Sequence, residues 1–454
     1  MQVLGISLGL VALAASQAAA QPSTNTNDLY SDYNYCQGIT PIAYKTYKPM
    51  KGATLNKVQV MMRHGDRTPS YFLPGDKTNY NICSNPAEIS IMANSDDILA
   101  SGTPNLRTNI VVSPEDNLYA STYWPGNCEV GQLTNRGAAQ TRQVGQDLRR
   151  VYVDQLGFLS SRLDTEDVYV RNTYMTRTKM TAENFLNGLY PLNTRAKDDV
   201  ITLNTYPSQI ETLALNTVVC PNLTALYSLF KATTYTDKIK ANYALFSKVN
   251  TIMGWNKVPT YNQTFNGDAL MPRYCNKLPL GCSAQDATQC LTVEEVLETG
   301  TLSSFIYTGF FREFPQAELA KRLAVGPFLK TFAASIRTTV AAADATNTQP
   351  GHGHSSKKRR VRPFELYSAH DQSLDQILSV IAVPSTPWPA YAGTLIFETY
   401  KTADKKDVIR VLYEGKVVPA NPKLNCTLDA CPLEIFLKFI ESYVPTDIKA
   451  ECGL

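Results

Sequence analysis

The stretch from residue 58 to residue 69 constrains the fold of this chain more than any other, because a buried strand in it ends directly in a group of cations. Residues 58–62 carry an apolar side chain at every second position, which predicts a strand. Arg63, His64 and Arg67 follow and form a cationic corner. Such a cluster is favourable when a dianion lies within it, because arginine side chains match phosphate oxygens in bidentate fashion. The stretch therefore predicts a phosphate site, and the alternative is a strand followed by a solvated basic turn.

Histidine usage favours the phosphate site over the solvated turn. The chain has only 4 histidines. His352 and His354 lie in a stretch rich in Gly, Ser and basic residues with no carboxylate or cysteine beside them, so we interpret that stretch as a flexible loop and not as a metal site. The remaining pair is His64 and His370, and His370 also ends an apolar strand and is followed at once by Asp371.

The composition is that of an ordinary globular protein. Of 454 residues, 44% are hydrophobic and 18% are charged, which is enough apolar material for a large core. This length predicts either one large domain with an insertion or two domains. The formal net charge of +3 is too small to indicate nucleic acid as a partner, and no basic stripe with interleaved aromatic residues is visible.

The first twenty residues read as a secretory signal peptide. Residues 3–15 form an apolar core, and residues 18–20 are three alanines that offer a cleavage site before Gln21. The usual Lys or Arg near the start is absent, and the alternative is a buried N-terminal helix. No later stretch reaches the ~18 uninterrupted apolar residues of a membrane-spanning helix. We therefore expect a soluble, secreted, extracellular protein with no membrane partner.

The cysteines agree with secretion. The chain has 10 of them, an even number that favours disulfides in a secreted protein. They lack the paired Cys-x-x-Cys spacing that would indicate structural zinc. Short separations predict the bridges Cys282–Cys290 and Cys426–Cys431, and the pairing of the others stays open. Glycosylation sequons, which fit a secretory route, occur at Asn222, Asn262 and Asn425.

A second predicted strand also ends at cationic residues. Residues 168–170 read as a strand that ends at Arg171, and Arg177 opens a helix that runs to Leu186. In open α/β sheets, ligands lie beyond the carboxyl ends of the strands, and a helix N-terminus adds partial positive charge for an anion. Because a cation in the first helical turn is otherwise disfavoured, Arg177 is a better phosphate-ligand candidate than Arg171. The alternative is a surface arginine.

The remaining elements alternate in the same way, and the middle of the chain is mostly helical. Thr134 is a candidate N-cap for the helix over 136–152. Gly326-Pro327 predicts the start of a new helix. Near the end of the chain, predicted strands cover 362–366, 393–400 and 408–413, and predicted helices cover 373–381 and 433–443. Between 205 and 344, the predicted helices cover 223–234, 239–253, 292–299, 316–324 and 327–344.

A linker over 347–360 separates the helical part from the last strands. It carries four consecutive basic residues, Lys357 to Arg360, which form a candidate cleavage site for a secretory-pathway protease. Intact mass of the secreted protein as one continuous chain would rule that cleavage out.

The three strand ends supply what phosphoryl transfer requires. Transfer needs an in-line nucleophile, positive groups on the equatorial oxygens and a proton for the leaving oxygen. His64 is the candidate nucleophile, because the neighbouring arginines lower its pKa and favour the neutral imidazole. Asp371 is the candidate donor of a proton to the leaving alcohol and then the base that activates water. We expect Asp66 to orient an arginine or the turn. The candidate phosphate ligands are Arg63, Arg67, Arg177 and His370.

Several segments resemble the motifs of one family. The segment Arg63-His64-Gly65-Asp66-Arg67-Thr68-Pro69 resembles the RHGxRxP signature of the histidine acid phosphatases, which form branch two of the histidine phosphatase superfamily. Segments 131–137, 177–191 and 368–371 are similar to the GQLT-x-x-G, RT…GLYP and C-terminal HD motifs of that family. The matches occur in the expected order over most of the mature chain.

The resemblance implies an α/β fold, with a phosphoglycerate-mutase-like three-layer core, a mostly parallel sheet and an inserted helical domain. The expected division is a signal peptide over 1–20, a core over 21–204 and 345–454, and a helical insertion over 205–344. A secreted acid phosphatase that hydrolyses phosphate monoesters through a phosphohistidine is expected, with no metal and no other cofactor. Carried over by position, His64 is the nucleophile, Asp371 is the proton donor, and the phosphate is bound by Arg63, Arg67, Arg177 and His370.

The substrate stays open. Asp66 and Thr68 follow the acid phosphatase type of motif, and no lysine occurs between Ser70 and Asp76 that would attract a highly anionic substrate. The insertion over 77–127 matches neither prostatic-type phosphatases nor phytases closely. The alternatives are a phytase-like phosphatase of myo-inositol polyphosphates and, from another class, a phosphate-binding protein without turnover. The sequence leaves the oligomeric state undetermined.

Overall fold

The computed structural model describes residues 29–38, 47–73, 76–83, 119, 122–196, 198–257, 263–283, 286, 288–346 and 362–454. Several features predicted from the sequence lie outside these residues. They are the signal peptide over 1–20, most of the insertion over 77–127, the sequon at Asn262, and the linker over 347–360 with its two histidines and its basic run.

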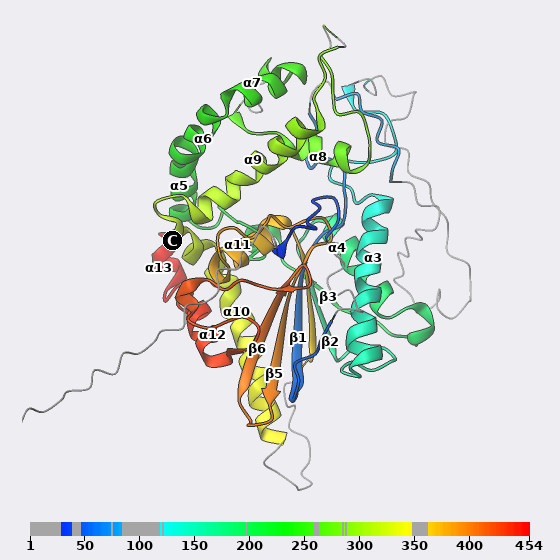
Figure 1. Ribbon diagram of the computed structural model, residues 1–454, viewed down its shortest axis with the longest axis vertical. Helices are drawn as coiled ribbons and strands as arrows, with labels where there is room; N and C mark the ends of the chain where they lie inside the picture. The colour runs from blue at the N-terminus through cyan, green and yellow to red at the C-terminus, as the bar shows by residue number, and fades with distance from the viewer. Residues whose placement is uncertain are drawn as a thin grey trace, which may run out of the picture.

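One sheet organises the structure (Figure 1). Its strands follow the order β3-β2-β4-β1-β5-β6-β7, and β8 pairs with β6. The half from β3 to β1 is parallel, and the pairs from β1 to β7 are antiparallel. The strands are β1 (Ala53–Arg63), β2 (Val168–Asn172), β3 (Leu203–Thr205), β4 (Phe364–Ala369), β5 (Thr394–Thr402), β6 (Asp407–Tyr413), β7 (Lys416–Val417) and β8 (Cys431–Pro432).

Helices cover both faces of the sheet, which confirms the predicted three-layer α/β fold (Figure 1). Val60 and Met62 of β1 point into a core formed with α3 (Asn135–Arg149) and α4 (Thr176–Leu189). Met61, between them, points into a second core on the opposite face. The helices that line this second core include α10 (Ala317–Thr346), α11 (Asp371–Ile381) and α12 (Leu433–Glu441).

The part of the chain between β3 and β4 is helical in the described residues, as predicted. Its helices before α10 lie beyond one end of the sheet, whereas α10 packs along one face of it (Figure 1). One helix there was not predicted, and another runs well past its expected end at residue 299. The division into a core and an inserted domain stays a prediction. The helices before α10 are α5 (Pro221–Phe230), α6 (Thr236–Ala241), α7 (Tyr243–Ile252), the unpredicted α8 (Gly267–Cys275) and the extended α9 (Val293–Arg312), and α13 (Ile448–Cys452) closes the chain.

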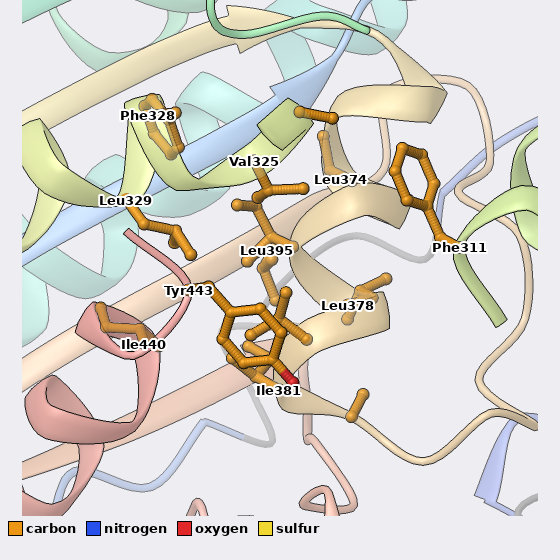
Figure 2. Packing of buried hydrophobic residues seen from close by; sticks show 14 of the residues in the cluster. Phe311, Val325, Phe328, Leu329, Leu374, Leu378, Ile381, Leu395, Ile440 and Tyr443 are labelled. Atoms are coloured by element: carbon orange, nitrogen blue, oxygen red, sulfur yellow. The ribbon is translucent and has the colours of Figure 1, made fainter. Parts of the chain in front are cut away.

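The predicted helix start at Pro327 is wrong, because α10 continues through this proline. Proline in a helix interior removes one backbone hydrogen bond and costs ~3 kcal/mol. Val325, Phe328 and Leu329 on either side of it are each at most 2% exposed. Full burial of such a side chain contributes ~1.5–3 kcal/mol. Figure 2 shows these three residues packed with Leu395 of β5 in the same core, so tertiary packing outweighs the local helix-breaking signal.

Five disulfides connect the described residues. The predicted bridges Cys282–Cys290 and Cys426–Cys431 are confirmed. The N-terminal segment over residues 29–38 is tied down by Cys36–Cys275, which joins it to the end of α8. The other bridges, which the sequence left open, are Cys83–Cys128 and Cys220–Cys452.

Helices α3 and α4 touch through two glycines, and this contact sets the position of α4 on the sheet. A Cβ on Gly145 would lie 2.0 Å from the carbonyl oxygen of Phe185, and a Cβ on Gly188 would lie 2.1 Å from that of Arg142. Because backbone approaches backbone at both positions, neither site tolerates a methyl group without movement of a helix.

We expect Gly145→Ala to lower the melting temperature by several degrees, because overpacking in a dense core costs ~1–3 kcal/mol. Differential scanning calorimetry of the two proteins checks this. Ala139→Ser is the control, since Ala139 is exposed on the same helix and should melt with the wild type. An unchanged melting temperature for Gly145→Ala would contradict the observed helix contact.

Candidate active site

Two neighbouring parallel strands bring the two predicted site histidines together. β1 and β4 are in register at Arg63 and Ala369. The next residue on β1, His64, donates its backbone N–H to the carbonyl oxygen of Ala369 at 3.0 Å, and His370 follows Ala369. The ring centroids of His64 and His370 are 5.5 Å apart, edge to face. The two histidines, 306 positions apart in the sequence, therefore share one site because their strands are adjacent.

The turn after His64 packs directly on the start of α3. A Cβ on Gly65 would lie 2.3 Å from the carbonyl oxygen of Gly137, and a Cβ on Gly137 would lie 2.1 Å from that of Asp66. Thr134 caps α3 by accepting a hydrogen bond from the backbone N–H of Gly137, as predicted. Glycine at both positions thus allows the chain to bring His64 against the helix.

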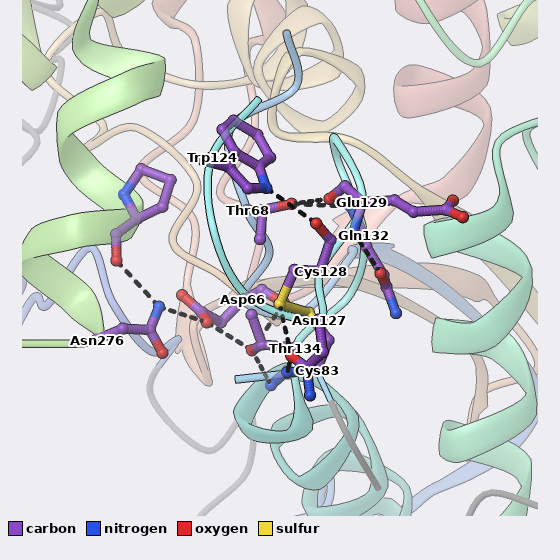
Figure 3. Close-up of a disulfide and its surroundings, with 12 residues drawn as sticks. Asp66, Thr68, Cys83, Trp124, Asn127, Cys128, Glu129, Gln132, Thr134 and Asn276 are labelled. Atoms are coloured by element: carbon purple, nitrogen blue, oxygen red, sulfur yellow. Dashed lines mark hydrogen bonds between the residues drawn. A yellow bond between two sulfur atoms is a disulfide. The ribbon is translucent and has the colours of Figure 1, made fainter. Parts of the chain in front are cut away.

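The side chain of Asp66 forms its hydrogen bonds within and beside this turn, and not with an arginine side chain. Its Oδ2 atom accepts hydrogen bonds from Thr134 at 2.6 Å and from Asn276 at 2.8 Å. Figure 3 shows these bonds beside the disulfide Cys83–Cys128. Of the two alternatives that the sequence left open for Asp66, the described contacts fit orientation of the turn.

His64 is held in one orientation as a neutral ring. Its Nδ1 atom lies 2.8 Å from the carbonyl oxygen of Gly65, so Nδ1 carries the proton and Nε2 keeps its lone pair. Burial, followed by the charges of Arg177, Arg67 and Arg63, holds the pKa of His64 well below its usual range. The ring therefore stays unprotonated in acid, which a nucleophile requires.

Arg63 and Arg67 flank the His64 ring, and each contacts one carboxylate. Arg63, which is 0% exposed, lies 2.8 Å from Asp371 and donates to the carbonyl oxygen of Pro389 at 2.7 Å. Arg67 lies 2.6 Å from Asp268, and its Nε atom is 3.4 Å from His64 Nε2. The guanidinium of Arg67 is thus fixed beside the lone pair of the predicted nucleophile, and that of Arg63 is near enough for its charge to lower the pKa of His64.

Arg177 enters the site from the first turn of α4. Burial and the nearby charge of Arg67 lower its pKa to about 10. Its Nε and the Nε of Arg63 are buried donors without a hydrogen-bond partner in the described residues, as are those of Arg171 and Arg195 outside this group of cations. An unpaired buried donor costs ~1–3 kcal/mol. An anion placed between these side chains would satisfy the donors and relieve the repulsion among the cations.

His370 and Asp371 form the third part of the site, at the N-terminus of α11. His370 Nε2 lies 2.9 Å from the hydroxyl of Thr173. Burial and then the charges of Arg177, Arg67 and Arg63 hold the pKa of His370 well below its usual range. The carboxylate of Asp371 is 20% exposed and contacts Arg63, so it lies at the solvent side of the buried cations.

The structure brings all six predicted site residues to one end of the sheet, and it keeps the rejected candidate away. Arg171 pairs with Glu211 at 2.6 Å and stacks on the ring of Tyr206 at 3.8 Å. Both contacts engage the guanidinium of Arg171 with protein groups, which agrees with the preference for Arg177 as the phosphate-ligand candidate. The six residues that meet are Arg63, His64, Arg67, Arg177, His370 and Asp371.

Sequence reasoning missed several residues that contact the site. Asp268 pairs with Arg67, but it lies in a segment for which no element was predicted. The guanidinium of Arg63 contacts the rings of both Tyr35 and Tyr391, at 4.9 and 4.1 Å from their centroids. No local pattern links these positions to residue 63. Thr173 is the partner of His370. The available signal for it was its position as a polar residue at the end of a strand.

Comparison with known proteins identifies relatives along most of the chain. Residues 54–414 match the family model described as "Histidine phosphatase superfamily (branch 2)". The chain is 26% identical to "Counting factor 60" of Dictyostelium discoideum over 440 residues, covering 92% of each protein. It is 25% identical to "Lysophosphatidic acid phosphatase type 6" of Homo sapiens over 410 residues, covering 88% of this chain and 86% of the relative.

Solved structures show the same fold. The apo form of a Hafnia alvei phytase superposes with a TM-score of 0.53 at 15% identity, covering 90% of this chain and 100% of the phytase. A phytase from Citrobacter braakii superposes with a TM-score of 0.52 at 15% identity, covering 88% of this chain and 99% of that structure. At these identities the likeness concerns the fold alone.

We expect His64→Gln to flatten the dependence of stability on acid pH. The folded protein keeps His64 neutral, whereas the unfolded chain binds a proton there below ~pH 6.5. Stability that is fully present above this pH is therefore lost as the pH falls, by at most about 1.4 kcal/mol per pH unit for one group. Urea denaturation without phosphate between pH 7 and pH 5 checks this. Parallel profiles for the two proteins would contradict the assignment of a neutral His64.

Proposed function

The chain belongs to branch 2 of the histidine phosphatase superfamily, and we propose that it hydrolyses phosphate monoesters through a phosphohistidine on His64. The observation that carries this proposal is the group of buried cations around a neutral imidazole, two of them with unpaired N–H donors in the described residues. A phosphate dianion satisfies both features at once. The name of another relative, "2-phosphoxylose phosphatase 1" of Homo sapiens, fits a phosphate-ester substrate.

In the first step, the lone pair of His64 Nε2 attacks phosphorus and the bond to the leaving oxygen breaks. Arg63, Arg67 and Arg177 neutralise the charge on the equatorial oxygens, because each guanidinium lies within or beside the site. Asp371 contacts one of these ligands, Arg63, at 2.8 Å. Its carboxyl group is therefore beside the bound phosphate, where it donates a proton to the leaving alcohol.

In the second step, water replaces the alcohol. The carboxylate of Asp371 takes a proton from this water, and the water oxygen attacks the phosphorus of the phosphohistidine. The bond between phosphorus and His64 Nε2 breaks, inorganic phosphate leaves, and Asp371 is protonated for the next cycle. The hydrogen bond from Nδ1 to the Gly65 carbonyl keeps the ring in one orientation through both steps.

The electrostatics of the site support activity in acid. A protonated carboxyl group is needed to release the alcohol, and an unprotonated imidazole is needed to attack. These two states coexist at low pH only where the pKa of the imidazole is depressed. Burial and three arginines supply this depression at His64.

We propose that the enzyme acts outside the cytosol. The five disulfides are consistent with an extracellular or lumenal protein. Within the residues that the structure describes, no helix combines the length and the apolar character needed to cross a bilayer. The sequons at Asn222 and Asn425 are both exposed, which makes them candidate glycosylation sites.

We expect His64→Ala to abolish phosphate release from p-nitrophenyl phosphate, because the covalent intermediate has no other acceptor in this scheme. A colorimetric phosphate assay at acid pH checks this, and circular dichroism confirms that the variant is folded. Residual turnover above one hundredth of the wild-type rate would contradict the assignment of His64 as nucleophile.

We expect Asp371→Asn to slow alkyl phosphates about 10²–10⁴-fold and to slow p-nitrophenyl phosphate much less. An alkoxide needs a proton to leave, whereas p-nitrophenolate is stable without one. Measurement of kcat/KM for glycerol 2-phosphate and p-nitrophenyl phosphate checks this, because kcat/KM reports the release of the alcohol and not the later hydrolysis of the phosphohistidine, which both substrates share. Asp237→Asn, at an exposed aspartate, is the matched control and should keep both rates. Equal losses on the two substrates would count against Asp371 as proton donor.

A further inference from the structure

The buried cations are covered on their solvent side by acidic side chains. Arg63 and His64 are at most 1% exposed, whereas the side chains of Asp371 and Asp268 are 20% and 21% exposed. Asp371 has a place in the proposed chemistry. Asp268 has none, although it contacts the phosphate-ligand candidate Arg67. The site therefore includes a partly exposed carboxylate, Asp268, whose role is unexplained.

Asp268 is fixed in this position by three contacts of its own and by the packing of its neighbour Gly267. Its Oδ1 atom lies 2.6 Å from Arg67, and its Oδ2 atom accepts hydrogen bonds from the backbone and the hydroxyl of Ser70 at 2.7 and 2.8 Å. The preceding residue, Gly267, is pressed against α9, where an added Cβ would lie 2.7 Å from the Cβ of Ser303. One oxygen of the carboxylate is thus held on Arg67 and the other on Ser70.

Helix α9 continues from this contact to an aromatic pair. Tyr307 lies one turn after Ser303, and residues four apart share one face of a helix. The ring of Tyr307 stacks on Trp388 with centroids 5.8 Å apart and an interplanar angle of 25°. The residue after Trp388 is Pro389, whose carbonyl oxygen accepts a hydrogen bond from Arg63 at 2.7 Å. The backbone next to the aromatic pair therefore contacts Arg63, the other arginine of the cationic corner.

These contacts form a continuous series that connects Arg67 to Arg63, and we call it the rim of the site. We define the rim by the side chains of Asp268, Tyr307 and Trp388. The pKa shifts of Tyr307 and Asp268 agree with a position of these two side chains near the charged groups of the site. Burial, then Tyr227, and then the charges of Asp371 and Asp268 raise the pKa of Tyr307. Burial alone would raise the pKa of Asp268, but Arg67 and the hydrogen bonds from Ser70 outweigh it and hold that pKa below its usual range.

We propose that this rim is the leaving-group subsite, and that it selects phosphomonoesters whose alcohol is uncharged and aromatic or apolar, with Asp268 rejecting substrates that carry a second phosphate beside the scissile one. The inference rests on the proposed phosphatase activity. The rings of Tyr307 and Trp388 offer apolar surface to the alcohol. The ionised carboxylate repels a further anion, which is selection by an unfavourable contact.

The first test compares two substrates in Asp268→Asn. Values of kcat/KM are measured for phenyl phosphate and for inositol hexakisphosphate, in the wild type and in the variant. The variant loosens Arg67 for both substrates, so the ratio of the two values is the readout. We expect the ratio of the inositol phosphate to the phenyl ester to rise about tenfold when the repelling charge is removed. Asp237→Asn is the matched control and should leave the ratio unchanged.

The second test addresses the aromatic pair. We expect Tyr307→Leu to raise KM for phenyl phosphate about tenfold, since an aromatic contact of the leaving group is lost, and to change KM for glycerol 2-phosphate much less. Tyr307→Phe keeps the ring and should restore the wild-type preference. A variant that fails to fold would lose both substrates equally, and Tyr307→Phe then decides the question on its own, because a changed phenyl preference in it would contradict the stacking role.

Failure of this inference is distinguishable from failure of the proposed function. If the wild type releases phosphate from none of the three substrates, the proposed function is wrong. If the wild type is active but prefers inositol hexakisphosphate, or if Asp268→Asn leaves the substrate ratio unchanged, the proposed function stands and the role of the rim is overturned.

Discussion

The site depends on the burial of several cationic side chains away from water. Three guanidiniums and two imidazoles share one buried region, and burial and mutual repulsion push the pKa of His64, His370 and Arg177 downward. Two carboxylates compensate part of this charge, since Asp371 pairs with Arg63 and Asp268 with Arg67. The remaining excess of positive charge makes the site complementary to a phosphate dianion.

The scaffold maintains this unfavourable arrangement by placing it where several elements end. The parallel strands β1 and β4 deliver His64 and His370 side by side. Helix α4 delivers Arg177, and its distance from α3 depends on the glycine contact between the two helices. Aromatic rings above and beside Arg63 replace part of its lost hydration. The helices between β3 and β4 then add Asp268 and Tyr307, so that the catalytic end of the sheet and its entrance come from different parts of the chain.

Sequence reasoning identified residues that the structure brings together where local chemistry carried the signal. Arg63, His64 and Arg67 are neighbours at the end of an apolar strand, and Arg177 stands out because a helix start disfavours a cation. It failed where distant packing decided the outcome. Pro327 reads as a helix start, yet α10 continues through it because the flanking side chains are buried against β5. Asp268 carries no local pattern at all, since its partner Arg67 lies 201 positions away.

The sequence alone therefore determined the α/β class, the strand ends, the family and the candidate catalytic residues, because each of these leaves a periodic or contiguous pattern. The tertiary structure decided which side chains surround those residues. It placed Thr173 on His370, tied Asp66 to the turn, and set Asp268 against Arg67. The physical reason is that hydrogen bonds and ion pairs in a buried site join atoms that are close in space, and closeness in space depends on how the strands and helices pack and not on their order in the chain.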